Sequence, residues 1–72
     1  MELKKTVGER IKECRKMKGL TQRQVGELMG IVTQQYQTYE SGRYELNYQQ
    51  LVMLCKILET SSDYLLGLTD NY

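Results

Sequence analysis

Residues 19–43, GLTQRQVGELMGIVTQQYQTYESGR, carry the clearest structural signals of the chain. Thr21 begins a T-x-x-Q pattern, the capping box that starts a helix. The apolar residues that follow predict a helix over residues 22–29, which Gly30 ends. After a short turn, we expect a second helix at residues 33–41. Helices this short are marginal in water, so both must be held in place by packing.

The second of these helices has a polar side without charge. Five of its polar residues have neutral hydrogen-bonding side chains: Thr33, Gln34, Gln35, Gln37 and Thr38. Exposed helix faces usually carry Lys and Glu, which are good helix formers. Two short helices joined by a Gly-containing turn form a helix-turn-helix, whose second helix enters the DNA major groove. There a Gln can bond adenine through two atoms, and a Thr methyl can contact thymine. The residues alone leave open the alternative of a surface helix that binds nothing.

The sequence on either side predicts three more helices. Before the central stretch, a helix over residues 4–18 is marked by apolar residues at spacings of 4, 3 and 3, which are Val7, Ile11, Cys14 and Met17. After it, the pair Asn47 and Gln50 caps an apolar helix at 48–58, and a Ser cap begins a last helix at 62–66. No segment alternates long enough to predict a strand. We therefore expect an all-α fold of five helices and a single domain, residues 1–72.

The composition excludes several kinds of chemistry. The 72 residues contain no His and two Cys, which excludes imidazole catalysis, Cys2His2 zinc sites and Ser-His-Asp triads. Cys14 and Cys55 fall on apolar helix faces, so we expect buried thiols rather than metal ligands. We expect no enzyme activity, no metal and no cofactor. A membrane-spanning apolar run and a signal peptide are both missing, so we expect a cytoplasmic protein, associated with a bacterial or phage nucleoid.

The net charge of +1 hides an uneven distribution. Residues 1–23 carry eight Lys or Arg and three Glu, a net charge of +5, whereas residues 24–72 carry two cations and six carboxylates, a net charge of −4. The near-neutral total predicts weak nonspecific binding to nucleic acid. The basic first third and Arg43 can nevertheless supply phosphate contacts. The alternative, from the residues alone, is an ordinary solvated first helix.

Residues 19–43 also resemble the helix-turn-helix of the Cro/phage-repressor-type (XRE) transcriptional regulators. The resemblance extends back through IKECRKMKGLTQ, residues 11–22, and forward through LCKILETSSDYLLGLTD, residues 54–70. It implies a compact five-helix, lambda-repressor-like DNA-binding domain in which the second and third helices form the helix-turn-helix. It also implies a structural ion pair between Arg15 and Glu40.

The resemblance assigns DNA contacts to individual residues of this chain. It implies that bases are read by the first exposed residues of the third helix, and the same groove-facing surface continues one and two turns later: Thr33, Gln34, Gln37 and Thr38. Backbone contacts are expected at Gln22, Arg23, Arg43, Tyr44 and Tyr36. Gln22 would begin a helix, where backbone N–H groups favour a phosphate.

Four residues depart from the pattern of this family. Gly26 replaces the usual Ala, Val32 replaces a Ser or Thr cap, Tyr36 replaces a buried aliphatic residue, and Leu46 replaces a Pro. Val32 is a poor cap, so Thr33 is an alternative cap, which would occupy a side chain that is expected to read a base. The hydroxyl of Tyr36 needs a partner, and we expect it to turn toward the DNA backbone.

These observations predict a sequence-specific regulator that binds double-stranded DNA. We expect a repressor that binds a pseudo-palindromic operator as a homodimer, because one module reads only about 4–6 base pairs. The expected dimer contact uses Leu46, Tyr48, the last helix and residues 68–72. One alternative is an antitoxin-type protein that binds a partner toxin and its own operator. Another is a scaffold that keeps the fold without binding DNA.

Overall fold

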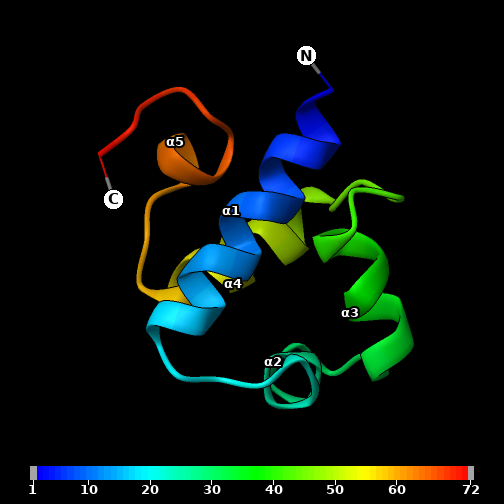
Figure 1. Ribbon diagram of the computed structural model, residues 1–72. Helices are drawn as coiled ribbons and strands as arrows, with labels where there is room; N and C mark the ends of the chain where they lie inside the picture. The colour runs from blue at the N-terminus through cyan, green and yellow to red at the C-terminus, as the bar shows by residue number, and fades with distance from the viewer. Residues whose placement is uncertain (1, 72) are drawn as a thin grey trace.

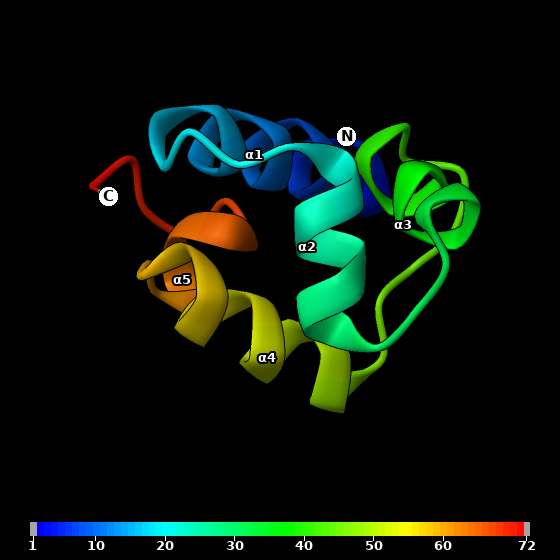
Figure 2. The same cartoon turned by 90° about the horizontal axis from the view of Figure 1, so that it is seen from below.

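The computed structural model describes residues 2–71, which form five α-helices and no strand. In chain order the helices are α1 (Leu3–Met17), α2 (Gln22–Met29), α3 (Thr33–Glu40), α4 (Tyr48–Leu58) and α5 (Ser62–Leu65). Figure 1 shows α1 crossing the middle of the domain, with α3 on one side and α5 on the other. Seen from below, α2 runs between α1 and α4 (Figure 2). The expected all-α, five-helix fold is confirmed.

Local sequence signals account for most helix ends. At α2, the Thr21 side chain accepts a hydrogen bond from the backbone of Gln24, whose own side chain accepts one from Thr21. Asn47 and Gln50 form the same reciprocal pair at α4. At the end of α1, Gly19 has φ +72° and the next residue bonds back to Arg15, as a left-handed helix stop requires. These contacts satisfy backbone groups that the short helices leave without partners.

The helix bounds differ from the expected ones by single residues. Lys18, Ser41 and Leu66 were expected as the last residues of α1, α3 and α5. Each is instead a C-cap with helical dihedral angles, half outside the helix. At its other end, α1 begins at Leu3, one residue earlier than expected.

The core is formed by apolar faces of all five helices. Its buried hydrophobic residues are Val7, Ile11, Cys14, Val25, Met29, Tyr36, Tyr39, Leu54, Leu58, Tyr64 and Leu65. Met17 is an exception to the expected pattern, because its side chain is 61% exposed. It is the last residue of α1, so the apolar spacing continues one turn beyond the part of the helix that other helices cover. Cys14 is buried as expected, whereas Cys55 is only half-buried at the edge of the core.

The segment after α4 is held against α1 by polar contacts. Arg10 donates to the carbonyl oxygens of Tyr64 at 3.1 Å and Thr69 at 2.9 Å, and its guanidinium lies 4.2 Å from the ring centre of Tyr64. The Tyr64 hydroxyl donates to Glu13 at 3.0 Å. The chain that follows α5 is thereby folded back onto α1. Tyr72, which was included in the expected dimer contact, lies outside the described residues.

None of the helices within residues 2–71 combines the length and the apolar character needed to cross a membrane.

Candidate nucleic-acid interface

A hydrogen-bonded ion pair fixes α3 against α1. Arg15 donates from Nε to Glu40 Oε2 at 2.5 Å and from Nη2 to Glu40 Oε1 at 3.3 Å. Its third contact runs from Nη1 to the carbonyl oxygen of Leu20 at 2.9 Å. The two side chains are 11% and 4% exposed. The ion pair implied by the resemblance is thus present, and it joins α1, the turn before α2 and the end of α3.

Both members of this pair are held in their charged forms. Burial favours the neutral acid of Glu40, but hydrogen bonds from Arg15, Tyr36 and Gln22 favour the carboxylate more, so the pKa of Glu40 lies below its usual range. The hydrogen bond to Glu40 raises the pKa of Arg15, against the opposing effect of burial. Glu40 therefore acts only as a hydrogen-bond acceptor at neutral pH.

Tyr36 does not reach the surface of the domain. Its side chain is 0% exposed, and its hydroxyl donates to Glu40 Oε2 at 2.6 Å. Burial raises the pKa of the Tyr36 hydroxyl above its usual range, so this group remains a donor. We therefore correct the expected role of Tyr36 from a DNA-backbone contact to a buried partner of Glu40. The physical reason is that the buried carboxylate needs donors, and a Tyr one turn earlier on α3 supplies one.

The outward face of α3 carries the four residues that were expected to read bases. Gln34 and Gln37 are exposed, whereas Thr33 and Thr38 are half-buried. The N-cap of α3 is the residue before Thr33, and it makes no side-chain capping bond, so Thr33 is the first helical residue rather than the cap. The Thr38 hydroxyl donates to the carbonyl oxygen of Gln35 at 2.6 Å. Its methyl group and oxygen lone pairs remain for a ligand.

Gln22, at the start of α2, makes its side-chain contacts within the protein. Its Nε2 donates to Glu40 Oε1 at 3.0 Å, and its Oε1 accepts from Gln37 Nε2 at 3.0 Å. No sequence pattern predicts this contact, because Gln22 and Gln37 lie on different helices. The structure thus brings two of the expected site residues together across the helix-turn-helix.

Cationic and aromatic side chains flank α3. Arg23 on α2 is exposed and pairs with Glu27 at 3.1 Å. Arg43, in the loop after α3, is exposed and lies 5.7 Å from the ring centre of Tyr44. Exposed ion pairs contribute little to stability, so Arg23 can exchange Glu27 for another anion at small cost.

Lys12 is a flanking residue that the sequence reasoning did not single out. It lines a polar hollow of about 290 Å³ together with Gln22, Gln37, Glu40 and Ser41. The available signal was its position on α1, three residues before Arg15, which places both side chains on one helix face. Lys12 of α1 thus lines the same hollow as Gln37 of α3.

Comparison with known proteins identifies the family. A family model described as helix-turn-helix matches residues 11–65, which include all of α2, α3 and α4. The chain belongs to this family, in its Cro/phage-repressor (XRE) branch. Two relatives come from Bacillus subtilis (strain 168). They are the uncharacterized HTH-type transcriptional regulator YqaE, 43% identical over 81% of this chain, and the SPbeta prophage-derived regulator YonR, 42% identical over 82%. The chain spans about half the length of these relatives, 50% and 55%.

Two solved structures share this arrangement of helices. The match to the clp gene regulator ClgR from Corynebacterium glutamicum covers 90% of this chain and 69% of the ClgR chain, with a TM-score of 0.84 and 26% identity. The P22 c2 repressor, solved in complex with synthetic operator 9T, matches 83% of the chain and 91% of its own, with a TM-score of 0.78 and 35% identity.

Proposed function

We propose that this chain is a sequence-specific DNA-binding module of a transcriptional regulator, and that α3 reads bases in the major groove. The observation that carries the proposal is the neutral, hydrogen-bonding face of α3, which the buried Arg15–Glu40 pair holds in a fixed orientation. Neutral amides and hydroxyls suit base edges, which present donors and acceptors rather than charge. The similarity to the P22 c2 repressor, solved on operator DNA, supports the same use of the fold.

The proposed contacts divide into base readers and backbone anchors. The base readers are Thr33, Gln34, Gln37 and Thr38, on the outward face of α3. The backbone anchors are the flanking side chains Arg23, Arg43 and Tyr44, to which we add Lys12. Gln22 is not counted among these anchors, because its side chain already bonds to Glu40 and Gln37.

We further propose that the chain binds a pseudo-palindromic operator as a homodimer and represses by occluding a promoter. A single α3 covers about 4–6 base pairs, and a two-fold dimer doubles this length with half-sites about 34 Å apart. Such a dimer needs a surface that complements itself, since each copy presents the same residues to the other.

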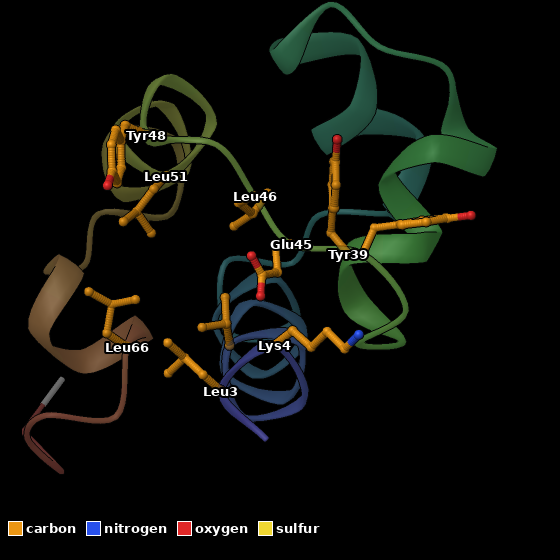
Figure 3. Close-up of a pocket in the computed structure, with 10 residues that line it drawn as sticks. Leu3, Lys4, Tyr39, Glu45, Leu46, Tyr48, Leu51 and Leu66 are labelled. Atoms are coloured by element: carbon orange, nitrogen blue, oxygen red, sulfur yellow. The ribbon is translucent and has the colours of Figure 1, made fainter. Parts of the chain in front are cut away.

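The proposed dimer surface is an apolar hollow of about 230 Å³ between α1, the α3–α4 loop, α4 and α5. Figure 3 shows Leu3, Leu51 and Leu66 around it, with Tyr48 at the start of α4. Tyr48 is 90% exposed, so it can fill the hollow of a second copy. Lys4 and Glu45 line the same hollow with opposite charges. In the proposed dimer, a two-fold axis through the hollow would bring Lys4 of one copy beside Glu45 of the other.

The proposed function is tested by selecting binding sites from a random duplex pool, followed by mobility shifts on the recovered sequence. We expect a pseudo-palindrome, and we expect transcription in vitro to fall when this site overlaps a promoter. A chain that enriches no sequence and shifts no duplex would refute DNA reading. Binding with unchanged or raised transcription would contradict repression alone.

The dimer is tested by reversing charges at the hollow. Lys4→Glu and Glu45→Lys should each weaken cooperative binding to two half-sites, and the double variant should restore it. Tyr48→Ser should weaken cooperativity as well, whereas affinity for an isolated half-site should stay unchanged. If neither single reversal changes cooperativity, the two copies meet elsewhere.

A further inference from the structure

The side chain of Gln22 lies between a buried charge and the exposed face of α3. On one side it donates to the carboxylate of Glu40, and on the other it accepts from the amide of Gln37, with both bonds 3.0 Å long. The three side chains form one hydrogen-bonded series that runs from the protein interior to its surface. The buried end of this series is anchored by Arg15.

The charge on Glu40 sets the direction of both amides. An ionised carboxylate can only accept hydrogen bonds, so Gln22 must turn its NH2 group toward it. The carbonyl oxygen of Gln22 then faces Gln37, which must in turn present its own NH2 group. Rotating either amide by 180° would bring two acceptors or two donors together and would break a hydrogen bond of the series.

This series determines what Gln37 can offer to a base. An amide has two N–H donors and one carbonyl acceptor. One N–H of Gln37 is used by Gln22, which leaves one donor and the acceptor for a ligand. Adenine presents an acceptor at N7 and a donor at N6, which match the remaining N–H and the carbonyl oxygen of Gln37. Guanine instead presents acceptors at both N7 and O6. A Gln37 with both N–H groups available could donate to both guanine acceptors.

We propose that Gln22 is a positioning residue, which orients Gln37 to select adenine over guanine, rather than a side chain that binds the DNA backbone. The inference rests on the proposed function, because it requires α3 in the major groove. It assigns Gln22 a role in specificity that acts entirely through Gln37.

The experiment compares Gln22→Met, which has a similar length and no amide, with Arg23→Met, a matched change at the next residue of α2. The base pair read by Gln37 is first located as the position whose preference disappears in Gln37→Met. Mobility-shift titrations then use two duplexes that differ only there, A·T or G·C. The wild type should prefer adenine by about tenfold or more, and Gln22→Met should remove most of this preference. Arg23→Met should weaken binding to both duplexes by the same factor.

Two outcomes overturn the inference while the proposed function stands. One is that Gln22→Met loses affinity for both duplexes by the same factor, as the loss of a backbone contact would. The other is a further change in preference when Gln22→Met is added to Gln37→Met. A wild type that selects no sequence would instead refute the proposed function and this inference together. In the free protein, the side-chain amide protons of Gln37 should shift in the NMR spectrum of Gln22→Met, and unchanged Gln37 resonances in a folded variant would exclude the series without any DNA.

Discussion

Gly8 of α1 and Glu40 of α3 are in backbone contact, so close that a β carbon on Gly8 would lie 2.5 Å from the carbonyl oxygen of Glu40. The carbonyl oxygen of Tyr39 would be 2.6 Å from the same atom. Two successive backbone carbonyls at the end of α3 thus pack on α1 where there is no side chain. This contact and the Arg15–Glu40 pair, two turns apart on α1, together fix the position of α3 on the domain.

Gly8→Ala is therefore expected to destabilise the fold, although Ala is the better helix former by about 1 kcal/mol. Backbone atoms cannot turn aside as a flexible side chain can, so α1 and α3 must separate, at a cost of about 1–3 kcal/mol. Gly26→Ala provides the matched control, because its β carbon would lie 3.3 Å from the carbonyl oxygen of Ile31 and needs a shift of only a few tenths of an ångström. In urea denaturation, the free energy of unfolding should fall for Gly8→Ala. For Gly26→Ala it should stay nearly unchanged or rise. Equal effects of the two substitutions on stability would show that the close backbone contact at Gly8 does not cause the loss.

The stability of the domain should fall in acid through Glu40. Its pKa is lower in the folded protein than in the unfolded chain, because hydrogen bonds from Arg15, Tyr36 and Gln22 outweigh the effect of burial. The carboxylate thus contributes full stability above the usual pKa of glutamate, and this contribution is lost as the pH falls through the lower folded value. Glu40→Gln should be less stable at pH 7 and should lose less stability between pH 7 and pH 3. An acid dependence in Glu40→Gln that matches the wild type would remove this carboxylate as its source.

The sequence predicted those parts of the structure that depend on near neighbours along the chain. The capping pair of Thr21 and Gln24 involves residues three apart, and its spacing alone predicts the start of α2. The left-handed turn after α1 follows from Gly19 in the same way. The end of α4 is different, because Glu59 adopts φ +54° there without the glycine that usually marks such a turn. Its side chain pairs with Lys18 at 2.6 Å, a contact between distant segments.

The parts that the sequence did not predict depend on contacts between helices. The buried role of Tyr36 could not be read from its helix, because the Glu40 carboxylate it serves is also required by Arg15 on α1. The bond between Gln22 and Gln37 spans 15 positions and involves two side chains that the pattern assigned to separate DNA contacts. In both cases the sequence drew attention to the residues, and tertiary packing decided what they touch.

The division between base readers and backbone anchors predicts two different kinds of mutant. Gln34→Ala should cost about 1–3 kcal/mol on the preferred site and relax the preference at one base pair, since Gln34 is exposed on α3. Arg43→Ala should weaken binding to all sequences by a similar factor, because a phosphate contact carries no base information. Repeating the site selection with each variant makes the comparison. An unchanged preference in Gln34→Ala would mean that another face of α3 meets the bases.

The salt dependence of binding should be shallow for a dimer of this class. In each copy of the proposed dimer, the cations assigned to phosphate contacts are Lys12, Arg23 and Arg43. Six phosphate contacts per dimer predict a slope of log K against log salt of about −5, since each contributes about −0.9. Lys12→Ala should make this slope shallower by about 2 units for the dimer. Lys56→Ala, in the last turn of α4, should leave it unchanged, because no DNA contact is assigned to that helix. A wild-type slope steeper than about −8 would mean that cations outside this set reach the DNA. An unchanged slope in Lys12→Ala would mean that Lys12 makes no phosphate contact.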